Sequence, residues 1–254
     1  MANIIAFSNQ KGGVGKTTSA VNTAASLGNL GKKVLLVDFD PQGNATSGVG
    51  ISKKSVVNSV YDLVIGRCSA KEAIIVTRFK NLSVIPSHIS LAGAEFELVD
   101  EKNRESKLRE ALKTVSDDYD YIIIDCPPSL GLLSINALAA STGVIIPMQC
   151  EYFALEGLSQ LLLTIKQVKK LYNPELDITG IMITMYNGRL NLTLQVMDEL
   201  KKYYADKIFR TTIARNVKLS EAPSYGEPIL YYDKYSKGGL AYTEIAKEII
   251  ERIG

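Results

Sequence analysis

The chain has 254 residues, 46% of them hydrophobic and 22% charged, which is the composition of a folded protein with a well-buried core. Its net charge of +2 is too small to indicate nucleic-acid binding, so any DNA affinity must come from a local basic patch. The three cysteines share no metal-ligand spacing, which indicates a reduced intracellular protein. No membrane span or signal peptide is recognisable, and we expect a cytoplasmic protein without a membrane partner.

Short β-branched runs alternate with amphipathic segments along the whole chain. Strands are predicted over residues 3–8, 33–38, 82–86, 121–125, 143–149, 178–184 and 207–212. Helices are predicted over residues 17–29, 104–115, 132–140, 155–171, 192–204 and 239–253. This alternation predicts an α/β fold with a mostly parallel, twisted sheet and helices on both faces. No linker or repeat divides the pattern, so a single domain over residues 1–254 is expected.

A glycine-rich loop lies between the first predicted strand and the first predicted helix. It reads Lys11, Gly12, Gly13, Val14, Gly15, Lys16, Thr17 and Thr18. Glycines let the backbone turn its N–H groups toward phosphate oxygens, and the dipole of the following helix adds positive potential. Lys16 is suited to neutralise the β- and γ-phosphates, and the Thr17 hydroxyl to ligate Mg²⁺. The sequence therefore predicts a P-loop nucleotide site.

Two further predicted strands end in carboxylates. Asp38 closes one of them, with Asp40 two residues later, and Asp125 closes the other. The carboxyl ends of strands border the ligand crevice of an open α/β sheet, so these acids should meet the P-loop. Asp125 is a candidate Mg²⁺ ligand. If the strand continues past Asp38, alternation places Asp38 and Asp40 on the same side, and both are expected to face the phosphates.

The P-loop departs from the standard pattern in a specific way. Gln10 replaces the first glycine, and a second lysine, Lys11, precedes Lys16 by five residues. This pattern resembles the deviant Walker A loop of the ParA/MinD family. The resemblance implies that Lys11 reaches across an ATP-dependent homodimer to the partner's nucleotide. It also implies that Asp40 orients the attacking water and helps organise Mg²⁺, and that ATP hydrolysis is slow.

Other segments resemble the short Soj branch of that family. They span residues 42–46, 85–87, 91–95, 151–157 and 220–226. Because the P-loop starts near residue 11, no N-terminal helix-turn-helix and no operator-specific DNA binding are expected. The resemblance implies a role in chromosome or plasmid partitioning. Non-specific double-stranded DNA of the nucleoid and a ParB-type centromere-binding protein are the implied partners.

The same resemblance assigns residues to the base of the nucleotide and to DNA. Residues 214–218 are similar to the segment that packs on adenine, with Asn216 at the base edge, and Met185 joins the nucleotide-binding set. Arg189 and Lys218 match positions where the family has DNA-contacting basic residues. Residues that could extend this patch are Arg215, Lys234 and Lys237. Such a patch should bind phosphates in a salt-dependent way.

Three alternatives belong to other functional classes. A MinD-like ATPase of the cell-division site would end in a basic amphipathic helix, whereas residues 240–254 carry at least as much acid as base. A metabolic ligase or kinase on a P-loop scaffold would need a small-substrate pocket and would not need Lys11. A module that binds ATP without hydrolysing it would not need Asp40.

Overall fold

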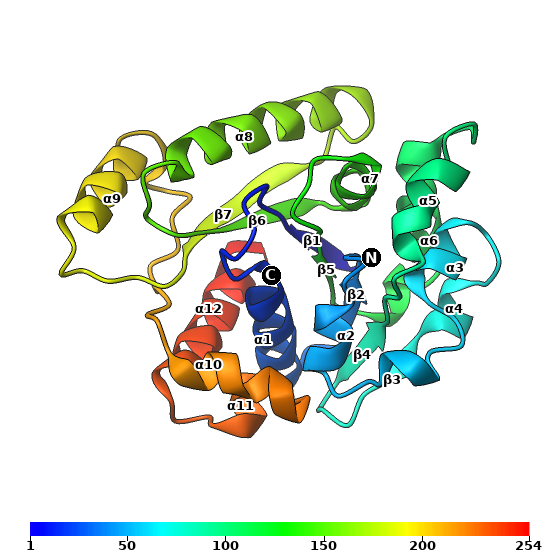
Figure 1. The fold of residues 1–254 in the computed structure, drawn as a ribbon, viewed down its shortest axis with the longest axis horizontal. Helices are drawn as coiled ribbons and strands as arrows, with labels where there is room; N and C mark the ends of the chain where they lie inside the picture. Colours follow the sequence, from blue (N-terminus) through cyan, green and yellow to red (C-terminus); the bar gives the residue numbers. More distant parts are fainter. Residues whose placement is uncertain (254) are drawn as a thin grey trace.

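A computed structural model describes residues 1–253 of the chain. Its centre is a seven-stranded sheet in the order β3-β4-β2-β5-β1-β6-β7 (Figure 1). The strands are β1 (Asn3–Phe7), β2 (Val34–Asp38), β3 (Ile75–Val76), β4 (Leu82–Ile85), β5 (Tyr121–Asp125), β6 (Gly143–Met148) and β7 (Asp177–Ile183). Only the edge strand β3 runs antiparallel to its neighbour, and the other pairs are parallel. The predicted α/β fold is confirmed.

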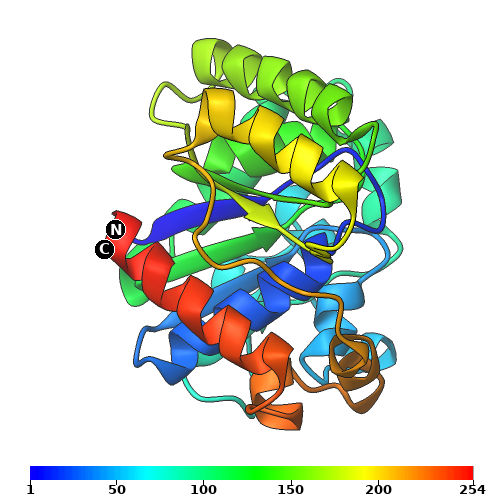
Figure 2. The ribbon, with the colours of Figure 1, turned by 90° about the vertical axis from the view of Figure 1, so that its left-hand side faces the viewer.

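Helices cover both faces of this sheet (Figures 1 and 2). They are α1 (Lys16–Asn29), α2 (Asn44–Gly48), α3 (Val60–Val64), α4 (Ala70–Ala73), α5 (Leu91–Glu97), α6 (Lys107–Lys113), α7 (Leu132–Ala140), α8 (Ala154–Leu171), α9 (Asn191–Tyr204), α10 (Val217–Glu221), α11 (Ile229–Tyr232) and α12 (Lys237–Ile253). Alternate residues of each central strand enter opposite layers: Ile5 and Phe7 pack with α1 and α12, whereas Ala6 faces α7 and α8. Strands buried on both faces therefore need near-continuous apolar runs.

The central strand β1 lies between β5 and β6. The strands β2 to β5 lie on one side of β1, and β6 and β7 lie on the other side. Register pairs Phe7 with Asp125 across β1 and β5, and Asp38 with Asp125 across β2 and β5. The carboxyl ends of these three strands thus meet at one level, where the strand order changes direction. That edge is where an open α/β sheet binds ligands.

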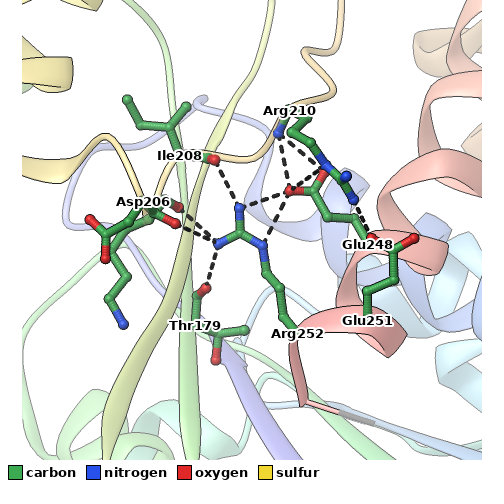
Figure 3. A network of polar contacts seen from close by, with 8 residues as sticks. Thr179, Asp206, Ile208, Arg210, Glu248, Glu251 and Arg252 are labelled. Carbon is green, nitrogen blue, oxygen red and sulfur yellow. Dashed lines mark hydrogen bonds and ion pairs between the residues drawn. The ribbon is translucent and has the colours of Figure 1, made fainter.

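The predicted strand over residues 207–212 is not a strand of the sheet. The segment runs extended beside β7 and forms a single bridge, from Ile208 to Ile181. Figure 3 shows what two carbonyl groups of the segment and of β7 contact: the guanidinium of Arg252, from the last turn of α12, donates hydrogen bonds to the carbonyl oxygens of Ile208 (2.8 Å) and Thr179 (3.1 Å). The carboxylate of Glu248, which is 4% exposed, holds Arg252 at 2.8 Å. A side-chain clamp thus replaces part of the strand ladder.

Six short helices, α2 to α5, α10 and α11, were not predicted, because four to seven residues are too few to show a helical period. The predicted helix over residues 104–115 is shorter, since a 3₁₀ turn over Arg104–Ser106 precedes α6. Within residues 1–253, no helix combines the length and apolarity needed to cross a lipid bilayer.

Candidate nucleotide site

The P-loop joins the end of β1 to the start of α1. Gly13 and Gly15 have φ angles of +76° and +85°, in the left-handed region that side chains disfavour. Gly15 is also the N-cap of α1, and no side chain caps the first turn. The free N–H groups at this helix start, with the positive end of the helix dipole, form an anion-binding cradle.

Lys16 supplies the buried positive charge of the cradle. Its side chain is 7% exposed, and Nζ donates a 3.0 Å hydrogen bond to the carbonyl oxygen of Lys11 in its own loop. Burial lowers the pKa of Lys16, while the nearby carboxylates of Asp125 and Asp40 oppose the shift. The P-loop lysine and two of the predicted acids therefore share one crevice.

Two residues that brace the P-loop were missed by the sequence reasoning. The Gln149 side chain donates a 3.1 Å hydrogen bond to the carbonyl oxygen of Gly13, and the Thr184 hydroxyl donates one of 2.7 Å to that of Val14. Each of the two residues directly follows a strand, Gln149 after β6 and Thr184 after β7, in a position similar to that of Asp125 at the end of β5. The rule that selected carboxylates at strand ends would have found them had it been applied to neutral polar residues.

Asp125 has the environment expected of a cation ligand. It is fully buried, and neither carboxylate oxygen has a hydrogen bond within residues 1–253. Burial raises its pKa well above the usual range, and the charge of Asp38 adds to the rise; the Thr17 hydroxyl and Lys16 oppose it. Buried carboxylates without partners are costly, and a divalent cation would satisfy this one. The residues present fit Mg²⁺.

The remaining ligands of a bound Mg²⁺ ion would have to be groups other than protein carboxylates. Residues 1–253 contain no cluster of three His, Cys, Asp or Glu side chains suited to a metal. Mg²⁺ is commonly held by one or two protein groups together with water and substrate phosphates. Asp125 and Thr17 are suited to that part, with Asp40 close by.

The structure corrects the expectation that the Asp38 carboxylate faces the phosphates. β2 ends at Asp38, so strand alternation does not extend to Asp40. The Oδ2 atom of Asp38 instead accepts hydrogen bonds from the backbone N–H and the hydroxyl of Thr46, both at 2.6 Å. Asp38 is fully buried, and this burial raises its pKa to about 6. Its carboxylate is engaged by the protein.

Asp40 lies in the loop after β2 and is 7% exposed. Its Oδ1 atom accepts a 2.9 Å hydrogen bond from the N–H of Gln42, and its carbonyl oxygen accepts one of 2.7 Å from the Ser87 hydroxyl. The carboxylate is therefore fixed on one side and lies close enough to Lys16 to influence it. This arrangement suits a group that orients a water molecule.

Lys11 lies at the rim of the crevice. Its ammonium forms an ion pair with Glu151, just before α8, and its side chain is 39% exposed. Gly12 beside it has open space where a Cβ atom would be. Lys16 and Lys11 thus occupy different environments, one inside the loop and the other on the accessible rim.

A cavity of about 240 Å³ adjoins the P-loop. Its lining includes Gly15, Thr18, Met185, Ile213, Asn216 and Tyr242. Asn216 is the N-cap of α10, and its Oδ1 atom accepts a 2.9 Å hydrogen bond from the N–H of Lys218. That bond leaves the amide Nδ2–H₂ group as the donor available to a base. Met185, which lines the cavity, has a φ of +50°, rare for a residue with a side chain.

The predicted DNA-binding residues lie on exposed, neighbouring segments. Tyr186 pairs with Ala214, which brings the loop of Arg189 beside the segment of Arg215. Lys218 follows on α10, where its ammonium forms a 2.8 Å ion pair with Glu221. Lys234, in the loop before α12, and Lys237, its first residue, are exposed, and the start of α12 packs against α10. Within residues 1–253, Arg189 and Arg215 have no acidic ion-pair partner.

Comparison with known proteins identifies the relatives of this chain. Residues 2–178 match the family model of an AAA domain. The chain is 57% identical to the sporulation initiation inhibitor protein Soj of Bacillus subtilis, over 98% of both chains. It is 52% identical to the chromosome-partitioning ATPase Soj of Treponema pallidum, over 100% of this chain and 99% of that one. The structure of cobyrinic acid a,c-diamide synthase from Mycobacterium smegmatis with bound ADP and magnesium has a TM-score of 0.86 and 35% identity, over 99% of this chain and 95% of that one.

Proposed function

The chain belongs to the family of Soj and ParA chromosome-partitioning ATPases, and we propose that it acts as an ATP-dependent homodimer that binds DNA without sequence preference. It is a P-loop ATPase whose cofactors are ATP and Mg²⁺. In the proposed cycle the ATP-bound dimer holds the DNA of the nucleoid. Slow hydrolysis, stimulated by a ParB-type centromere-binding protein, releases it.

The residues of one protomer account for nucleotide binding and hydrolysis. The P-loop N–H groups and Lys16 would bind the phosphates, and Asp125 and Thr17 would hold the cation. Mg²⁺, when bound, supplies charge neutralisation on the β- and γ-phosphate oxygens. Asp40, fixed by the Gln42 N–H, orients a water molecule for in-line attack. The rate enhancement comes from positioning and electrostatics, and no covalent intermediate is needed.

The observation that best supports the proposed dimer is the environment of Lys11. Lys16 is buried and supplies the cationic charge inside the loop, whereas Lys11 is accessible and paired with Glu151 at the rim. An accessible lysine at this position is suited to leave Glu151 and stabilise phosphate charge on a facing protomer, as arginine fingers do in trans. ATP would then promote dimerisation because each nucleotide contacts both copies.

DNA binding is proposed for the surface formed by Arg189, Arg215, Lys218, Lys234 and Lys237. Their positions on adjoining segments favour contacts with successive phosphates, which carry no sequence information. Dimerisation would double this surface and convert weak contacts into useful affinity. ATP would control DNA binding by this route.

The first test is a gel-shift titration of an arbitrary duplex with ATP or ADP, each at two salt concentrations. We expect a shift only with ATP, weaker at the higher salt because counterion release drives the binding. Lys16→Ala should remove the shift together with the binding of a fluorescent ATP analogue, and Lys33→Ala, an exposed lysine far from the crevice, should behave as wild type. Equal shifts with ATP and ADP would contradict the nucleotide control.

Gly12→Val tests the dimer separately. Nothing lies within 4 Å of a Cβ atom at residue 12, so the monomer should tolerate valine and still bind ATP. The side chain would stand on the rim where two protomers face each other, and sizing chromatography should show a monomer with ATP. Gly93→Val in α5, where a Cβ atom meets only the Glu97 carboxylate at 3.9 Å, is the control that should dimerise normally. An ATP dimer of Gly12→Val would refute the proposed interface.

The alternative functions give different results in the same assays. The mycobacterial relative bears the name of a metabolic enzyme, and a ligase of that kind would depend on a small substrate for turnover. A MinD-like protein would bind lipid vesicles with ATP. Absence of any DNA shift would favour these two, and their substrates and vesicles would be tested next.

A further inference from the structure

We infer that Asp38 and Thr46 are positioning residues for ATP hydrolysis, which hold the loop of Asp40 through a buried chain of hydrogen bonds. Neither residue touches the P-loop in the hydrogen-bond network. The inference rests on ATP hydrolysis and on the proposed role of Asp40, and it is independent of DNA binding.

The chain of contacts links three segments, of which the one with Ser87 is distant in sequence from the other two. It starts at Asp38, whose Oδ2 atom accepts the Thr46 hydroxyl at 2.6 Å. The Thr46 oxygen accepts the backbone N–H of Ser87 at 2.9 Å, and the Ser87 hydroxyl donates to the carbonyl oxygen of Asp40 at 2.7 Å. The end of β2, the helix α2 and the loop after β4 are thereby tied to the backbone of Asp40.

The chemistry of the partners fixes the direction of each hydrogen bond. The backbone N–H of Ser87 can only donate, so the Thr46 oxygen accepts from it. The single hydroxyl proton of Thr46 is then available for Asp38. Asp38, Thr46 and Ser87 are each fully buried, so water cannot replace a missing partner. Removing the Thr46 hydroxyl would leave the Ser87 N–H without a partner and free the loop to shift.

Such a shift would affect hydrolysis more than nucleotide binding. The phosphates are bound by the P-loop, Lys16 and Thr17, which make no hydrogen bond to Thr46 or Ser87. The water-orienting carboxylate of Asp40, by contrast, is two residues from Asp38 and anchored by Ser87. Displacement of a catalytic group by about 1 Å can cost about 100-fold in rate.

Thr46→Val tests the inference through the separation of rate from affinity. With saturating ATP and Mg²⁺, we expect single-turnover phosphate release to slow by about 10- to 100-fold. The affinity for a fluorescent ATP analogue should stay within about threefold of wild type, and Thr46→Ser should restore the rate to within about threefold. Asp40→Ala, measured alongside, tests the proposed role of Asp40 separately.

Thr77→Val is the matched control. The Thr77 hydroxyl donates to the carbonyl oxygen of Leu82 (2.6 Å) and accepts the N–H of Phe79 (3.2 Å), the same pattern as Thr46, but at the opposite end of β4. The Thr77→Val variant should lower the urea midpoint of unfolding as Thr46→Val does, but it should leave the rate of phosphate release unchanged. A wild-type rate in Thr46→Val, an equal rate loss in Thr77→Val, or a loss of nucleotide affinity as large as the loss of rate would each overturn the inference.

A second pair of variants tests the same inference if Thr46→Val does not fold. Ser87→Ala removes only the hydrogen bond to Asp40, and Ser141→Ala removes an equivalent buried bond, from its hydroxyl to the carbonyl oxygen of Ala137 at 2.7 Å. Only Ser87→Ala should slow phosphate release, by about 3- to 10-fold. Equal rates in the two variants would overturn the inference.

Discussion

The phosphate crevice and the proposed DNA-binding surface are both suited to phosphate groups, but by different physical means. In the crevice, Lys16 and Asp125 are nearly or fully buried, and strand register fixes the position of Asp125 beside Asp38. On the basic surface the side chains are exposed: Lys218 is paired with Glu221, and Lys234 lies 4.7 Å from the ring centre of Tyr235. The crevice depends on the position of individual atoms, the surface on summed charge.

This difference predicts how the two regions respond to substitution. A single change in the crevice should remove a step completely, because a buried group has no substitute. A single change on the surface should have a small, additive effect that depends on salt. The expected effects therefore decrease from the crevice to the surface.

Asp40→Ala should have the largest effect, a loss of about 100-fold or more in phosphate release, because no other carboxylate is held by the Gln42 N–H. ATP binding should persist, and the ATP-bound protein should hold DNA for longer. Phosphate release at saturating ATP measures the first effect and dissociation from labelled duplex the second. Asp118→Ala, an exposed acid, is the control, and rapid release by Asp40→Ala would remove this residue from the mechanism.

Asp125→Asn should abolish Mg²⁺-dependent hydrolysis and yet raise the free energy of unfolding by about 1–3 kcal/mol without Mg²⁺. The pKa of Asp125 is higher in the folded than in the unfolded state, so the folded state binds more protons and stability falls as pH rises above about 4. The gain from asparagine should therefore be larger at pH 8 than at pH 5. Urea unfolding in EDTA measures both, with Asp118→Asn as the control; a destabilised Asp125→Asn protein would contradict the assignment.

The double variant Arg189→Ala, Lys218→Ala should weaken binding of every duplex by about tenfold. The dependence on salt should become shallower, because a surface that neutralises fewer phosphates releases fewer counterions. ATP-dependent dimerisation should be unaffected. Lys166→Ala, Lys170→Ala removes the same charge from exposed positions in the C-terminal half of α8 and serves as the control. Equal affinity of the two double variants would move the DNA surface elsewhere.

Glu221→Gln should have the smallest effect, a gain of about two- to threefold in DNA affinity, because Lys218 would lose its 2.8 Å ion pair and the surface one negative charge. Glu244→Gln is the control, since Glu244 forms a similar pair with Lys247 (2.7 Å) farther along α12. The same duplex titration compares them. A loss of affinity in Glu221→Gln would mean that Glu221 orders Lys218 for binding.

The sequence by itself determined the α/β fold, the P-loop and the level at which Asp38 and Asp125 lie. These features depend on local rules: apolar runs form buried strands, glycines permit the left-handed backbone at Gly13 and Gly15, and parallel strands align their carboxyl ends. The family resemblance, carried by Lys11 and the segments after the P-loop, is confirmed by identities of 50% and more.

Only the tertiary structure decided what each polar group contacts. Asp38 and Asp125 look alike in the sequence, but Thr46 satisfies the first and no described residue satisfies the second. Gln149 and Thr184 brace the P-loop across more than 130 residues, and Arg252 holds the segment expected to be a strand. Hydrogen-bond partners distant in sequence leave no local pattern, because only the packing of helices and strands brings the donor to its acceptor.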